Sequence, residues 1–166
     1  MRTSLKFVLA LVATAATAAP AAAQISDNID ATATVLQALT VTGDASLAFG
    51  NIAPSQIKTV AAGAAASGHF SMAGAPGSSV SFRFNALPAT LQIAGLTLSA
   101  WTGLHRDVNT AAGASVFTPT AGVAESVTMN AADGNYFVWI GATLTAAGVV
   151  APGSYTQPIV LEVFYN

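Results

Sequence analysis

The chain contains no cysteine, and only 7% of its 166 residues are charged, against roughly 25% in an average soluble domain. The absence of cysteine excludes a disulfide scaffold, a zinc ribbon, a thiol enzyme and a cysteine-ligated iron–sulfur cluster. The low charge comes with 53% hydrophobic residues and a formal net charge of −2. This combination excludes a solvated disordered tail and a coiled coil.

The first 23 residues have the pattern of a secretory signal peptide. Two basic residues precede an apolar run over 7–19, which is too short to span roughly 30 Å of bilayer. A proline ends the run, and the alanines at 21–23 fit a cleavage site. We expect cleavage after residue 23 and a single exported domain over 24–166, which passes through the periplasm to the cell surface. An uncleaved membrane anchor is the alternative.

After residue 23 the basic residues are Lys58, Arg83 and Arg106, against seven acidic residues, so the expected mature chain has a net charge of −4. Three scattered cations cannot neutralise a phosphate backbone, which excludes nucleic acid as a partner. Because no disulfide can form, the fold must be stabilised by its core or by neighbouring molecules.

Apolar and polar residues alternate with period two, and no stretch has the 3.6-residue period of an amphipathic helix. Seven to nine short strands are expected, separated by turn signals that contain glycine or proline. This pattern predicts an all-β fold, an immunoglobulin-like antiparallel β-sandwich. The strands are expected at 29–41, 47–52, within 57–73, at 79–86, near 96–101, and at 115–118, 125–131, 136–145 and 154–165.

The connections are predicted from turn-forming residues. Gly43-Asp44 indicates a turn after the first strand, and Asp133-Gly134 a tight turn before the most strongly strand-forming stretch. Residues 102–124 are expected to be a long loop with one short strand near 115–118.

No catalytic or metal-binding pattern is present. His105 and Asp107 have a spacing that can hold a metal, but two ligands do not make a site. We therefore expect a surface loop with a local ion pair there, and we expect His69 to lie on a strand. The nucleophile-elbow, P-loop and dinucleotide motifs are absent from the sequence. We expect no enzymatic activity, no metal and no cofactor.

Trp101 is the aromatic residue that we single out as a candidate ligand contact, because it borders the predicted 102–124 loop. Its alternation with Leu98 predicts that the two side chains lie on opposite faces of a strand. A monomeric secreted adhesin or carbohydrate-binding module that uses Trp101 is therefore one alternative function. A small outer-membrane β-barrel is a further alternative, which the low charge and the clustered aromatics disfavour.

The two ends of the mature chain carry the clearest alternation. An extended, mobile segment over 24–36 can add as a donor strand to the sheet edge of another subunit, or it can be the first strand of its own domain. The sequence leaves both readings open. At the N-terminal end the shared face consists of Ile25, Ile29, Ala31, Ala33 and Val35, and on the terminal strand it consists of Ile159, Leu161, Val163 and Tyr165.

Short motifs at 31–35, 39–42, 47–52, 152–156 and 160–165 give the chain a resemblance to a known family. It resembles an exported bacterial family of unknown function that is Ala/Gly-rich, cysteine-free and ends in an aromatic strand. That family is similar in layout to spore-coat-U and fimbrial pilin domains.

The resemblance implies an incomplete immunoglobulin-like sandwich that a neighbour completes with its donor strand. It implies a structural subunit of a surface pilus, fimbria-like filament or coat with a role in cell adhesion. The implied partners are other copies of the chain, a periplasmic chaperone and an outer-membrane usher. No cofactor is implied.

Overall fold

The computed structural model describes residues 27–166, so the predicted signal peptide at 1–23 and Ile25 lie outside the described residues. Within 27–166 the chain is all-β and contains no helix, hence none with the length and apolar composition needed to cross a membrane. Every strand lies in the unit formed by residues 35–166. The strands are β1 (Thr40–Ala45), β2 (Ile57–Val60), β3 (Gly68–Ala73), β4 (Ser79–Phe84), β5 (Leu96–Arg106), β6 (Ser115–Phe117), β7 (Ala124–Thr128), β8 (Asn135–Ala146) and β9 (Leu161–Tyr165).

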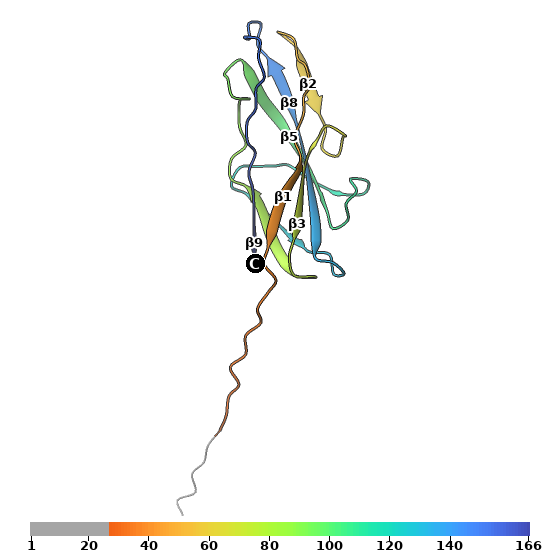
Figure 1. Cartoon of the computed structure of the whole chain (residues 1–166), viewed down its shortest axis with the longest axis vertical. Coiled ribbons are helices and arrows are strands. Elements are labelled where there is room, and N and C mark those ends of the chain that lie inside the picture. Colours follow the sequence, from red (N-terminus) through yellow and green to blue (C-terminus); the bar gives the residue numbers. More distant parts are fainter. Residues whose placement is uncertain (1–26) are drawn as a thin grey trace, which may run out of the picture. The chain divides into compact units, whose positions relative to one another are not determined.

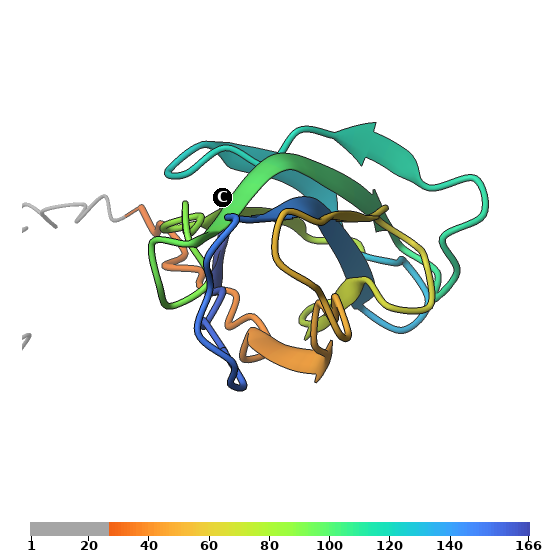
Figure 2. The same cartoon turned by 90° about the horizontal axis from the view of Figure 1, so that it is seen from above.

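The strands form two antiparallel sheets, consistent with the predicted β-sandwich (Figure 1). The larger sheet has the order β1-β3-β8-β5-β6, and β2 continues along the edge of β8 that β3 occupies. The smaller sheet has the order β7-β4-β9. Figure 2 shows, from above, β1 and the C-terminal run on adjacent sides of the fold. Both β1 and β9 are edge strands of their sheets.

One half of the sandwich has a fully buried core, which we call the closed half. There the smaller sheet covers the first half of β8, and the side chains of Val80, Phe82 and Val138 are fully buried. This burial is worth roughly 1.5–3 kcal/mol for each large side chain. The members of this core are Met72, Val80, Phe82, Phe84, Phe117, Val127, Met129, Tyr136, Val138, Ile140 and Leu161.

The other half, which we call the open half, has a smaller buried core. The pairing of β4 with β9 ends at Phe84 and Leu161, so no strand of the smaller sheet faces the second half of β8. The buried members are Leu96, Leu98, Ala142, Leu144 and Ala146. Around them lie large side chains that are only partly buried, namely Leu47, Phe49, Ile52, Leu91, Ile93, Trp101, Val150 and Tyr155.

A bulge in β5 overturns two expectations. The strand runs to Arg106 rather than ending near 101, and its register against β8 shifts between Ser99 and Thr102. Ala100 has a φ of 48° at this point. One extra residue moves all later side chains to the opposite face. Trp101 therefore packs against both core clusters instead of lying opposite Leu98.

His105 is also turned inward by the bulge, so the expectation of a surface loop with a local ion pair was wrong. Its Nδ1 lies 2.7 Å from the hydroxyl of Tyr136, and the rings of Phe82 and Phe117 meet it edge-on. Burial lowers the pKa of His105 below its usual value, against a smaller opposing effect of Glu125. Burial, with a smaller contribution from Asp107, raises the pKa of Tyr136 to about 12.

The remaining strand predictions divide into two groups. Those over 57–73, 79–86, 115–118, 125–131 and 136–145 are confirmed as β2 to β4 and β6 to β8. The predicted turn at Gly43-Asp44 is wrong, because both residues lie in β1, at a register shift opposite β3. Of the strand predicted at 29–41, only residues 40 and 41 lie in β1, and residues 29–39 form no strand. Residues 47–52 form no strand either, and the terminal strand begins at Leu161 instead of 154.

Candidate functional site

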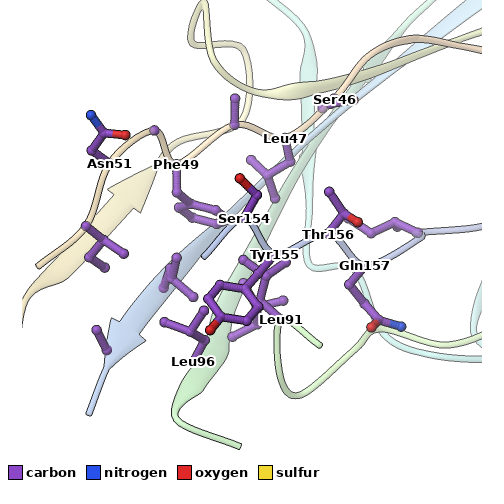
Figure 3. A pocket seen from close by; sticks show the side chains of 18 of the residues that line it. Ser46, Leu47, Phe49, Asn51, Leu91, Leu96, Ser154, Tyr155, Thr156 and Gln157 are labelled. Carbon is purple, nitrogen blue, oxygen red and sulfur yellow. The ribbon is translucent and has the colours of Figure 1, made fainter. Parts of the chain in front are cut away.

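A groove of about 950 Å³ runs along the open half. Its two walls are the irregular segments 46–54 and 150–159, and its floor is apolar (Figure 3). Leu47 and Phe49 point from one wall into the space that Tyr155 borders from the other. The floor includes Phe70, Leu91, Leu96, Leu98, Ile140 and Leu144.

The first wall, 46–54, is held by few hydrogen bonds. The amide of Ala48 donates to the carbonyl of Ala66 at 2.9 Å. The Nζ of Lys58 donates to the carbonyl of Phe49 at 3.2 Å. Gly50 has a φ of 62°, a left-handed conformation that glycine adopts without strain. This turn of the backbone brings the side chain of Ile52 to the groove, whereas Asn51 points away from it.

The second wall, 150–159, has even less backbone pairing. Among residues 27–166, no backbone–backbone hydrogen bond involves this segment. Its polar contacts are made with side chains: the Tyr155 hydroxyl donates to the carbonyl of Ala151 at 2.7 Å, and the amide of Thr156 donates to Oε1 of Gln92 at 3.1 Å. Most of this wall is exposed to solvent, so water can satisfy its peptide groups, and these groups are free to pair with an added strand.

The terminal-strand residues predicted from the sequence lie where the alternation placed them. Leu161 is buried, and Ile159, Val163 and Tyr165 are partly buried against the closed core, while Val160 and Phe164 are exposed on the other face. The Tyr165 hydroxyl accepts a hydrogen bond from the amide of Ala75 and donates one to the carbonyl of Gln37. Tyr165 thereby anchors the chain just before β1.

Of the predicted donor residues, those that the structure describes, Ile29, Ala31, Ala33 and Val35, are not part of any strand. Ile29 is 97% exposed and Val35 is 93% exposed, and Ala31 and Ala33 are also exposed. Large aliphatic side chains at such exposure are an unfavourable arrangement in water, because burying each of them would contribute roughly 1.5–3 kcal/mol. The apolar side chains of this segment are therefore exposed.

A cluster of polar and aromatic side chains lies on the outer face of the larger sheet. Nδ1 of His69 lies 3.2 Å from Asp44, and the ring stacks on Trp139. The Nε2 of His69 is buried and has no hydrogen-bond partner within 27–166. The described residues contain no group of three side chains suited to a metal ion. Trp101 is not part of the groove lining.

Sequence reasoning did not identify the groove. Leu47, Phe49 and Tyr155 lie in motifs that we noted, but each motif taken alone indicates an ordinary strand or turn. The signal that could have found the site is the period-two alternation of 47–52 and 154–165 considered together with their lack of a partner strand. Comparison of the chain with protein-family models, curated proteins and solved structures finds no match.

Proposed function

We propose that the chain is a structural subunit of a surface filament or coat, assembled when residues 25–35 of one copy fill the groove of the next. The observation that carries this proposal is the groove itself, an apolar channel between two extended walls that have little or no backbone pairing. An added strand can supply backbone hydrogen bonds to a wall and can cover the apolar floor with its alternate side chains.

The donor segment has the matching properties. Its apolar face is exposed, at 97% for Ile29 and 93% for Val35, and its central positions are the small residues Ala31 and Ala33. Eleven extended residues span roughly 36 Å, which is enough to run the length of either wall. The segment carries two carboxylates, Asp27 and Asp30. Asp30 lies on the opposite face, whereas Asp27 has the parity of the apolar face, so that face is free of charge over 29–35.

Export and surface location belong to the same proposal and rest on the predicted signal peptide. A subunit with an open apolar groove is prone to aggregate before it meets its neighbour. A periplasmic chaperone that covers the groove and an outer-membrane usher that orders assembly are the partners that this proposal requires.

Cysteine cross-linking tests the proposal directly, since the chain has no cysteine of its own. The double variant Ala31→Cys/Gln157→Cys places one thiol on the donor and one on the groove. With a short bismaleimide we expect a ladder of covalent multimers on a denaturing gel. Each single variant can give at most dimers.

The matched control is Ala31→Cys/Val116→Cys, because Val116 is 81% exposed on β6, away from the groove lining. A ladder of equal length in this control would contradict docking in the groove. Filaments that form normally but give no ladder with the groove pair would contradict it as well.

Deletion of residues 25–35 is the second test. It should leave a monomer that is still exported and should abolish filaments, since only the donor is lost. Intact surface filaments in this deletion variant would refute the donor role.

A further inference from the structure

The hydroxyl of Tyr165 joins three separate parts of the fold, at the place where Figure 1 shows the C-terminus beside the start of β1. The amide of Ala75, in the turn between β3 and β4, donates to this oxygen at 2.8 Å. The hydroxyl donates its own proton to the carbonyl of Gln37 at 2.7 Å. Because a hydroxyl can accept and donate at once, both bonds are satisfied together. We call this pair of bonds the Tyr165 clasp.

The local sequence leaves room for the clasp at Gly74. A Cβ atom at this position would lie 2.8 Å from the Tyr165 hydroxyl and 2.7 Å from a methyl group of Leu39. Contacts this short force one of the neighbours to move. Leu39 packs against the closed core. The chain before β1 is therefore held at two points, by the packing of Leu39 and by the hydrogen bond to Gln37.

The bond to Gln37 is the last fixed point of the backbone before the donor segment. Among the described residues it is the one hydrogen bond that residues 35–38 make, and their side chains are exposed. When the donor segment docks on a neighbour, a single residue, Leu36, separates it from the clasped Gln37. If the bond were lost, the free stretch would extend to residue 38, because Leu39 is the next residue that packs against the core.

We infer that Tyr165 is a positioning residue for the joint between successive copies, and that its clasp sets how stiffly one copy is held on the next. This inference rests on the proposed function and adds a role for a residue that does not line the groove. A joint of one residue allows few relative orientations of the two domains that it connects. A joint of three residues without internal contacts allows many. The clasp therefore acts on the geometry of the assembled material and not on docking itself.

Removal of the Tyr165 hydroxyl tests the inference, because Tyr165→Phe keeps the ring and loses only the clasp. We expect filaments to form, but with a persistence length in electron micrographs that is lower by roughly threefold. The matched control is Tyr136→Phe, which loses a hydroxyl bond to His105 in the closed half, away from the joint. Its filaments should keep the stiffness of the unaltered ones. An equal loss of stiffness in this control would overturn the inference.

Insertion of Gly-Gly between Leu36 and Gln37 tests the joint without changing the clasp or the core, and it decides the question if Tyr165→Phe does not fold. The insertion lengthens the joint from one residue to three, so it should lower the persistence length about as much as Tyr165→Phe does. Filaments of unchanged stiffness from either variant would overturn the inference and leave the proposed function intact.

NMR relaxation of the unassembled chain measures the clasp without filaments. The backbone amides of Gln37 and Ala38 should have order parameters near the rigid value of about 0.85 in the unaltered chain, and below about 0.6 in Tyr165→Phe, while those of β1 stay unchanged. Equal order in the two chains would overturn the clasp alone. If the unaltered chain formed no filaments, the proposed function and the joint would both be wrong.

Discussion

The closed and open halves of this sandwich are built on the same long strand, β8, yet they differ in how the opposite face is covered. In the closed half, β4, β7 and β9 supply a second sheet, and Val80, Phe82 and Val138 are fully buried. In the open half, two irregular walls take the place of that sheet, and Leu47, Phe49 and Tyr155 are only partly buried.

The closed half therefore holds most of the large buried side chains, whereas the open half has no second sheet over its floor. A sandwich without its covering strand has the same side-chain chemistry on the floor, but it lacks both apolar contacts and backbone partners there. We therefore expect substitutions in the closed half to lower the free energy of unfolding. Substitutions in the open half should instead weaken the docking of the donor segment.

The largest expected effect contrasts one phenylalanine from each half. Phe82→Ala removes a fully buried ring and should lower the free energy of unfolding by about 3–5 kcal/mol. Phe49→Ala removes a partly buried ring, so it should cost about 1–2 kcal/mol in the isolated subunit, yet it should block filament formation. Urea denaturation and electron microscopy of assembled material measure the two effects. Equal destabilisation by both variants would remove the distinction between the halves.

A smaller effect is expected from the buried polar pair of the closed half. Tyr136→Phe leaves Nδ1 of the part-buried His105 without its partner at 2.7 Å, which should cost about 1 kcal/mol. The double variant Tyr136→Phe/His105→Leu removes both polar groups and should recover part of this loss. Thermal unfolding of Tyr136→Phe, His105→Leu and the double variant checks the prediction. If the two single substitutions destabilise additively in the double variant, the prediction is wrong.

His105 and Tyr136 should also make the free energy of unfolding depend on pH, His105 at acidic pH and Tyr136 at alkaline pH. Burial lowers the pKa of His105 from 6.5, so the unfolded chain binds a proton first and stability falls as the pH drops below about 6.5. Tyr136 has its pKa raised to about 12 from 10.0, so stability also falls as the pH rises above about 10. Unfolding at pH 5, 8 and 11 measures this, and a His105→Gln variant should lose the dependence between pH 6.5 and 5.

The sequence predicts the strands of the closed half better than the walls of the open half. β4, β7 and β8 could be predicted because their alternation is matched by partners within the chain. The inward positions of Trp101 and His105 could not, because a single bulge near Ala100 reverses the alternation and no local signal marks it. The segments 29–39, 47–52 and 154–160 have strand patterns, but among residues 27–166 they pair with no strand. In our proposal their partners belong to another copy, which no single chain contains.

The smallest expected effect comes from Lys58, which tests how the first wall is held in place. Its ammonium group donates to the carbonyl of Phe49 at 3.2 Å, in a wall that has no strand pairing of its own. Lys58→Met keeps the aliphatic stem but loses this bond, so it should lower the free energy of unfolding by about 1 kcal/mol or less. Because the wall loosens, filament growth followed by light scattering should slow more than stability falls. Lys58→Arg keeps a donor and should retain most of the growth rate. If Lys58→Met slowed growth no more than an equally destabilising change in the closed half, the wall would have no separate role in docking.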